Sequence, residues 1–373
     1  MGKSTGLAVR YALVVLSYVT LSPTLLSAPA FSVPRESGRE SEQTSARIPF
    51  TQRYHSVQRG GIVRAANSAI TCQVAHDPAA ASCAEVQRGA QEGVNGDFDM
   101  LYTDVDDDPN TYNSSRAELA LPAHSRVSYA RLYWGGNLRV GEQKPPKDNG
   151  RVLFAEPGGE YKEVLADTPV AHRTAGGSDA FQASADVTPL VRQSEAGRYT
   201  VAQINVAKGH SAVGAWGGWT LVVAYENEQQ PLRNLAVWDG FETLGAAGRT
   251  QSVKLAGLDI PAGATGRAGV VSYDGDRSVK GDALSVTTGR FRPVSLSNSA
   301  NPANNVMNST ITDFGRPVIK RQPDYVNTLG YDSDVFDLKP ALSHGGDSLN
   351  FRFSAESGEY FLGALFVQAD SRR

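Results

Sequence analysis

Two neighbouring stretches, GGWTLVVAYE (217–226) and RNLAVWDGF (233–241), decide the fold of this chain. Their apolar residues follow a period of two, and β-branched and aromatic side chains fill the apolar positions, which is typical of strands. The same pattern recurs in five further runs: RVSYARLYWGG (126–136), RYTVAQINVA (198–207), RAGVVSYDG (267–275), DSLNFRFSA (347–355) and EYFLGALFVQA (359–369).

The segments between these runs favour turns. The 37 Gly and 19 Pro residues, with Asn and Asp, separate the apolar runs. No window of helix length keeps a 3.6-residue apolar stripe behind a capping residue, and only 181–193 predicts one helical turn, before Pro189. We predict an all-β protein made of two β-sandwich, jelly-roll-like domains, because exported all-β chains of this size commonly close as packed sheets.

A weak internal repeat divides the chain. ADVTPLV (185–191) recurs as FDLKPAL (336–342), and LALPAHSRVSYARLYWGG (119–136) is matched by LDIPAGATGRAGVVSYDGD (258–276). An internal duplication explains this pattern, although turn chemistry common to all-β chains also explains it. The expected domains are residues 48–229 and 230–373, joined near Gln229-Gln230-Pro231.

The first thirty residues have the order of an export signal. Lys3 and Arg10 precede an apolar run, and Ala28-Pro29-Ala30 has the small-x-small spacing of a cleavage site. The alternative is an uncleaved anchor, but the run falls short of the roughly 20 apolar residues that a spanning helix needs. Residues 1–30 are therefore predicted to be a signal peptide, and the polar residues 31–47 a flexible tether.

Charge and cysteine content narrow the class of protein. The net charge is −3 and the 36 basic residues are scattered, so nucleic acid is not an expected partner, and no membrane-spanning segment is expected after signal cleavage. Cys72 and Cys83 are the two cysteines, and in an oxidising compartment such a pair predicts a disulfide. A redox or metal pair would need C-x-x-C spacing or further ligands.

The segment DFDMLYTDVDDD (97–108) is unusually acidic. Asp104, Asp106 and Asp108 have the alternate spacing of a calcium loop, but Pro109 replaces the turn glycine and Ser115 replaces the final Glu. A calcium site is one interpretation and a solvated acidic turn is the other, which we favour. No other cofactor is expected, and SDVFD (333–337) is a weaker acidic candidate.

Tryptophans beside paired glycines form a second unusual feature. YWGG (133–136) and WGGW (216–219) place Trp134, Trp216 and Trp219 next to backbone that carries no side chain. Exposed rings would suit stacking against sugars, whereas buried rings would fill a sandwich core. We favour the core, because aromatic residues in strands usually pack.

Catalytic signatures are weak, and we assign no catalytic residue. GHSAVG (209–214) has Val213 where a nucleophile elbow requires Gly, and the six histidines show no H-x-H or H-E-x-x-H spacing. Paired carboxylates for glycoside hydrolysis meet only in the fold, so the sequence leaves that chemistry open.

Several segments, taken in order, resemble one known module. They are RAELALP…RVSYARLYWGG, ASADVTPLV, GGWTLVVAYEN, PLRNLAVWDGF and LSNSANPANNVMNSTITDFG…DYVNTLGYDSDVFDL. The module is the N-terminal β-rich region of large secreted bacterial surface proteins, which there precedes tandem immunoglobulin-like repeats of uncharacterised function. The resemblance implies a compartment and an architecture but no active site, and this chain ends where the repeats would start.

We therefore expect a non-enzymatic β-sandwich protein, secreted or associated with the cell envelope, that acts in surface binding or adhesion. Its partner would be a surface protein or a glycan, bound by loops at one end of a sandwich. The alternative is a carbohydrate-active protein, either a glycan-binding module that uses exposed tryptophans or a hydrolase that uses carboxylates of the acidic segment.

Overall fold

The computed structural model describes residues 48–245 and 250–372, and these are almost entirely β, with 53% strand and 6% helix for the chain. The all-β sandwich prediction is confirmed. The predicted signal peptide and tether lie outside the described residues. Within those residues, no helix has the length and apolar content that a membrane span requires.

The helical segments are short. They are α1 (Cys83–Gln87), α2 (Thr188–Ser194) and the 3-10 turns Asn95–Asp97 and Pro146–Asp148. Helix α2 starts at the place where a helical turn was expected to stop, because a proline is tolerated in the first turn, where its missing N–H has no helical partner.

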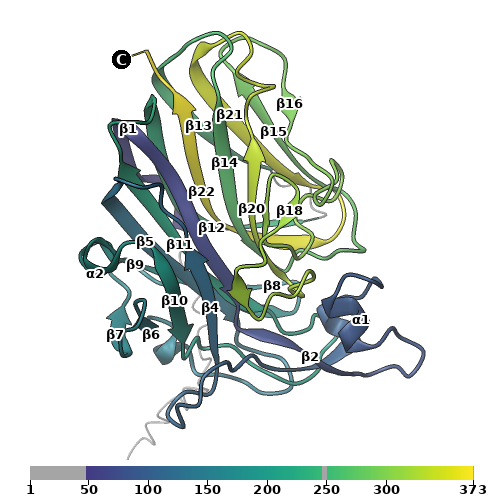
Figure 1. Cartoon of the computed structure of the whole chain (residues 1–373). Coiled ribbons are helices and arrows are strands. Elements are labelled where there is room, and N and C mark those ends of the chain that lie inside the picture. The colour runs from purple at the N-terminus through teal and green to yellow at the C-terminus, as the bar shows by residue number, and fades with distance from the viewer. Residues whose placement is uncertain (1–47, 246–249, 373) are drawn as a thin grey trace, which may run out of the picture. The chain divides into compact units, whose positions relative to one another are not determined.

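An 11-stranded sheet organises the chain (Figure 1), and its neighbouring strands are antiparallel except for the pair β17 and β20. Its strands, in order, are β18 (Arg316–Pro317), β17 (Thr312–Asp313), β20 (Tyr331–Asp337), β14 (Gly266–Tyr273), β22 (Glu359–Asp370), β12 (Leu232–Gly245), β1 (Ile48–Ser68), β11 (Gly217–Glu226), β5 (Arg126–Asn137), β9 (Ser178–Asp186) and β8 (Ala171–Ala175).

Smaller sheets accompany the large one. The five-stranded sheet contains β19 (Arg321–Gln322), β4 (Ser114–Leu119), β10 (Gly197–Ala202), β6 (Arg151–Ala155) and β7 (Lys162–Leu165). The four-stranded sheet contains β13 (Thr250–Ile260), β21 (Gly346–Ala355), β15 (Asp282–Thr288) and β16 (Val294–Ser295). A separate pair joins β2 (Ile70–Ala75) and β3 (Phe98–Tyr102).

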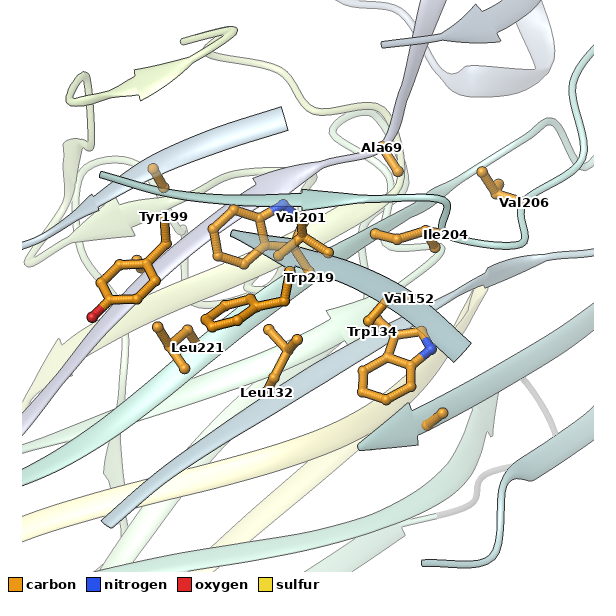
Figure 2. Close-up of a cluster of buried hydrophobic side chains, with 14 of the residues drawn as sticks. Ala69, Leu132, Trp134, Val152, Tyr199, Val201, Ile204, Val206, Trp219 and Leu221 are labelled. Carbon is orange, nitrogen blue, oxygen red and sulfur yellow. The ribbon is translucent and has the colours of Figure 1, made fainter. Parts of the chain in front are cut away.

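Each smaller sheet shares an apolar core with one half of the large sheet. In the first core, Tyr199 and Val201 of β10 lie with Trp134, Leu132 and Trp219 of the large sheet (Figure 2). In the second core, apolar residues of β13, β15 and β21 lie with those of β14 and β22. We call these units the first and the second sandwich.

The two sandwiches repeat one strand order. The first has β11-β5-β9-β8 in one sheet and β4-β10-β6-β7 in the other, while the second has β22-β14-β20-β17 and β13-β21-β15-β16. Each strand of the first thus has a counterpart in the same chain order in the second. The predicted repeat is therefore visible as two copies of one strand arrangement.

Strand β1 belongs to both sandwiches. Its residues 48–59 pair with β12, and its residues 60–68 pair with β11 (Figure 1). The change occurs at Gly60, where φ is +145° and an added Cβ would lie 1.8 Å from the carbonyl oxygen of Tyr225, so only glycine fits. The expected domain boundary near residue 229 falls between β11 and β12. Strand β1 pairs with both of these strands and so joins the two halves, and the division into two domains stays a prediction.

The two halves of the large sheet also pack against each other. Trp216, which precedes β11, lies 5.4 Å from the ring of Phe361 on β22, and the hydroxyl groups of Thr220 and Tyr331 are 2.7 Å apart. This third core contains strand residues of both sandwiches, and the candidate site begins next to it, at the residue after Tyr273.

Candidate functional site

Loops from both sandwiches surround a pocket of about 400 Å3, which we call the acidic pocket. Five separate segments of the chain contribute to it: the first 3-10 turn, the β8–β9 turn, the loop before β11, the end of β14 and the β21–β22 turn. Its lining residues are Val94, Asn95, Gly176, Ala212, Val213, Asp274, Asp276, Gly358 and Glu359. Strands therefore hold its walls in place.

Asp274 stands at the point where β14 ends. Its φ of +63° is a left-handed conformation, which Asp tolerates better than most residues do. Its N–H donates to the carbonyl of Gly330 at 2.8 Å, and the Ser178 hydroxyl donates to Oδ2 at 3.3 Å. Burial, followed by the charge of Asp276, raises the pKa of Asp274 well above its usual range.

Asp276 is two residues further on and has a buried carboxylate oxygen, Oδ1, without a hydrogen-bond partner among the described residues. Burial and the charge of Asp97 raise the pKa of Asp276 to about 7. Near neutral pH the two neighbouring carboxyl groups therefore hold a proton that a bound positive charge could displace.

Two further polar groups around this pocket lack partners within the described part of the chain. The Nδ2 of Asn95, a residue that is 2% exposed, has no hydrogen bond of ordinary geometry, although the Asn95 side chain is near enough to Asp274 to lower the pKa of that carboxyl. The hydroxyl of Tyr360, also 2% exposed, lines an adjoining cavity that shares Asp274 and Asp276 with the acidic pocket. An unpaired buried polar group costs about 1–3 kcal/mol, so a water or a ligand that bonds to it would stabilise the site.

More carboxylates lie behind the pocket. A Cβ added at Gly275 would be 2.7 Å from Oδ2 of Asp332, so this carboxylate lies close to Gly275, which lines the adjoining cavity. Burial and the charge of Asp334 raise the pKa of Asp332 well above its usual range, and burial raises the pKa of Asp334 to about 7. Backbone N–H groups of Asn308 and Thr310 donate to Asp332 at 2.9 and 3.0 Å.

Asp104, Asp106 and Asp108, which the sequence singled out as calcium ligands, do not line the acidic pocket or its adjoining cavity. Of the other acidic residues that it noted, Asp97 acts on the pKa of Asp276 and Asp334 acts on that of Asp332. Asp104 accepts a hydrogen bond from Ser114 at 2.7 Å, Asp106 accepts one from Thr111 at 3.0 Å, and Asp108 accepts one from the side chain of Asn110 at 2.8 Å. Among the described residues, no three His, Cys, Asp or Glu side chains are placed to hold a metal ion. The two interpretations of this loop, a calcium site and the solvated turn that we favour, both stay predictions, and each of these carboxylates already has a partner in the turn.

The three tryptophans are in the cores. Trp134, Trp216 and Trp219 are each 0% exposed, so the interpretation as a sugar-stacking platform is corrected in favour of packing. The indole N–H of Trp134 donates to the carbonyl of Asn149 at 2.8 Å, and that of Trp219 donates to Ser115 at 2.9 Å. These bonds satisfy the polar edges of two buried rings, as buried tryptophans require.

The predicted disulfide between Cys72 and Cys83 is present, with Cα atoms 5.7 Å apart. It joins β2 to the start of α1, whose N-terminus is capped by Ser82. The disulfide therefore ties the segment around α1, which adds few residues to the core, to strand β2.

The sequence interpretation missed the acidic pocket, although it contained two signals. YDGD (273–276) places two carboxylates immediately after an apolar strand, and GHSAVG (209–214) was considered only as a nucleophile elbow. In the structure Ala212 and Val213 of that loop line the pocket, and the His210 ring stacks on His76 at 3.7 Å. The pattern did not reveal that these segments meet, because they come from different sandwiches.

Comparisons with known proteins add little. No family model matches the chain, and no curated protein matches it. Among solved structures, one of infectious bursal disease virus, Gx strain, is 12% identical with a TM-score of 0.21, covering 87% of this chain and 73% of that chain. A mutant VP2 protein of the same virus, in T=1 particles, is 11% identical with a TM-score of 0.22, covering 86% and 72%. Likeness at this level carries no argument about function.

Proposed function

We propose that this chain is a non-enzymatic binding protein, secreted or held at the cell envelope, that acts in surface recognition or adhesion and binds a positively charged group in the acidic pocket. The observation that carries the proposal is the convergence of five chain segments on one open pocket that contains carboxylates and an unpaired amide. Loops on a rigid β scaffold are a common way to build a binding face.

The chemistry of the pocket favours a cationic ligand. Asp274 and Asp276 are acceptors when ionised, and a guanidinium or ammonium group would pair with them and reach the carbonyl of the Asn95 side chain. Surface placement is supported by the disulfide, which suits an oxidising environment, by the predicted signal peptide and by the resemblance to secreted bacterial surface proteins.

Binding of tetra-arginine and tetra-lysine peptides tests the proposal. We expect the full chain to bind them, and Asp276→Asn to weaken binding at least tenfold. The matched control is Asp107→Asn, which removes the same charge from an exposed position outside the pocket. Because ionised carboxylates attract the cation, and the pKa of Asp276 is raised to about 7, affinity should increase between pH 6 and pH 8. Equal binding by both variants, or no binding, would contradict the proposal.

The alternative is a glycoside hydrolase. The specific observation in its favour is the pair Asp274 and Asp276 in an open pocket, since a carboxyl group with a raised pKa can act as a general acid. Release of reducing sugar from a polysaccharide panel, abolished by Asp276→Asn, would favour it over simple binding. A glycan-binding module that uses Trp134 or Trp216 is not supported, because both side chains are buried.

A further inference from the structure

A second pocket lies at the other end of β14. It has a volume of about 290 Å3 and is lined by Arg233, Thr265, Gly266, Arg267, Phe314, Asp337 and Gln368. Since β14 spans eight residues, the two pockets are separated by about 25 Å along the strand. We call this one the Arg267 pocket, and none of its lining residues lines the acidic pocket.

Arg267 is held in this pocket without a polar partner. Among residues 48–245 and 250–372, no hydrogen bond or ion pair involves its guanidinium, which lies 5.2 Å from the ring centroid of Phe314. Burial is the main cause of the lowered pKa of Arg267. Tyr225 and Asp313 act in the opposite direction, and the positive charges of Arg233 and Arg64 add to the effect of burial. A partly buried guanidinium that makes no hydrogen bond is stabilised by an anion that comes within hydrogen-bond distance.

Two of the three acidic neighbours of Arg267 are already paired with other arginines. Asp370 accepts from Arg233 at 3.1 Å and from the hydroxyl of Thr265 at 2.8 Å. Asp313 pairs with Arg64 at 3.3 Å, and Asp337 accepts from the N–H of Lys339 at 2.8 Å. Asp370 and Asp313 are thus each paired with another arginine. Asp337, which lies opposite Arg267 in the β14–β20 pairing, has only a backbone donor and, within the described residues, no ion pair with the Arg267 guanidinium.

Phe314 forms an apolar wall in an unusual backbone conformation. Its φ is +52°, a left-handed value that is costly for a bulky aromatic residue, yet its ring is 44% exposed. The N–H of Phe314 donates to the carbonyl of Val335 at 2.8 Å, which holds the turn in place. An exposed ring held against a guanidinium in a strained turn is a feature that occurs at ligand sites.

We propose that the Arg267 pocket binds a carboxylate group, with the guanidinium of Arg267 as the bidentate partner and the Phe314 ring beside the ligand's apolar part. Guanidinium geometry matches a carboxylate. Asp337 lines the same pocket, so a singly charged carboxylate is favoured over a doubly charged phosphate, which that acid would repel.

The test uses 4-fluorobenzoate with the full chain, observed by fluorine NMR, and the uncharged 4-fluorobenzamide as the matched ligand. We expect line broadening for the acid alone, displacement by acetate, and weaker displacement by phosphate. Arg267→Met should lower the affinity at least tenfold, whereas Arg292→Met, which removes an exposed arginine of the second sandwich, should leave it unchanged.

Phe314→Gly provides a second variant in case the loss of Arg267 disturbs folding. Glycine accepts the positive φ without strain, so the fold should be kept while affinity for 4-fluorobenzoate falls severalfold. The proposal is overturned if the acid does not bind, if the amide binds equally, if phosphate displaces more strongly than acetate, or if Phe314→Gly and Arg267→Met both bind normally.

Discussion

The two sandwiches have the same strand order but bury different chemistry. The first encloses Trp134 and Trp219 and is accompanied by the disulfide, whereas the second encloses the carboxylates Asp282, Asp332 and Asp334, each no more than 6% exposed. The second carries the acidic pocket at the end of β14. In the first, the counterpart strand β5 ends at Asn137, whose side chain and N–H bond to the neighbouring backbone.

This difference indicates that two copies of one strand arrangement can bury different kinds of side chain. An apolar core stabilises the fold without presenting unpaired groups, while buried carboxylates cost stability in their charged form and acquire raised pKa values.

The largest effect is expected from Trp134→Ala in the first core. Removing a fully buried ring leaves a cavity and loses its hydrogen bond to Asn149, at a cost of about 3–5 kcal/mol. Denaturant unfolding measures the change. Phe291→Ala, in the second sandwich and 46% exposed, is the control and should cost far less. A loss below about 1 kcal/mol at Trp134 would mean that the first core is not what stabilises that sandwich.

The disulfide should contribute the next largest effect. Replacing both Cys72 and Cys83 by Ser opens a short loop and should lower the free energy of unfolding by about 3 kcal/mol. Non-reducing mass spectrometry of a peptide spanning both positions checks the bridge itself, through a two-proton mass difference. Unchanged stability of the double variant would show that fixing the segment around α1 does not stabilise the rest of the chain.

The second sandwich should respond to pH through Asp334. Its raised pKa, about 7, means that its contribution to stability is present below the unfolded pKa and is lost as pH rises through the folded value. Asp334→Asn keeps the side chain neutral at every pH. The free energy of unfolding of the variant should therefore rise relative to that of the native protein between pH 4 and pH 8. One pKa unit corresponds to about 1.4 kcal/mol, and we expect a relative gain of at least that size.

Unfolding at both pH values measures this gain, with Asp107→Asn in the first sandwich as the control for a change of charge at an exposed position. A gain of equal size in that control would remove the assigned difference between the sandwiches.

The smallest effect is expected from calcium at the acidic loop of the first sandwich. Because Asp104, Asp106 and Asp108 bond within their turn, we expect no shift in Tm between chelator and about 10 mM calcium, a range that covers weak extracellular sites. A bound ion would instead raise stability by about 2.7 kcal/mol at a hundredfold excess over Kd. A rise that Asp106→Ala abolishes would establish a calcium site.

The sequence predicted the parts that depend on local pattern. Alternating apolar residues gave the strands around Trp134 and Trp219, and an isolated cysteine pair gave the disulfide. The sites depend on distant contacts, and the sequence could not supply them. Asp276 and Asn95 are 181 residues apart, and no periodicity reveals that loops from two repeats face one pocket. Likewise Phe314 and Arg267 are 47 residues apart in the sequence and come together because β17 and β14 both pair with β20.

The division of β1 between two partners has a consequence for the order of folding. This strand is the first of the described chain, yet Gly60 pairs with Glu226 and Ile48 pairs with Phe241, more than 160 residues later. Pairings at such separations are slow to form, because a long loop must close before they reward the chain. During synthesis the backbone N–H and C=O groups of β1 therefore lack these two partner strands until β11 and β12 have emerged. Both partners of β1 precede the strands of the second sandwich in the chain, so β1 can pair with them before that sandwich is complete.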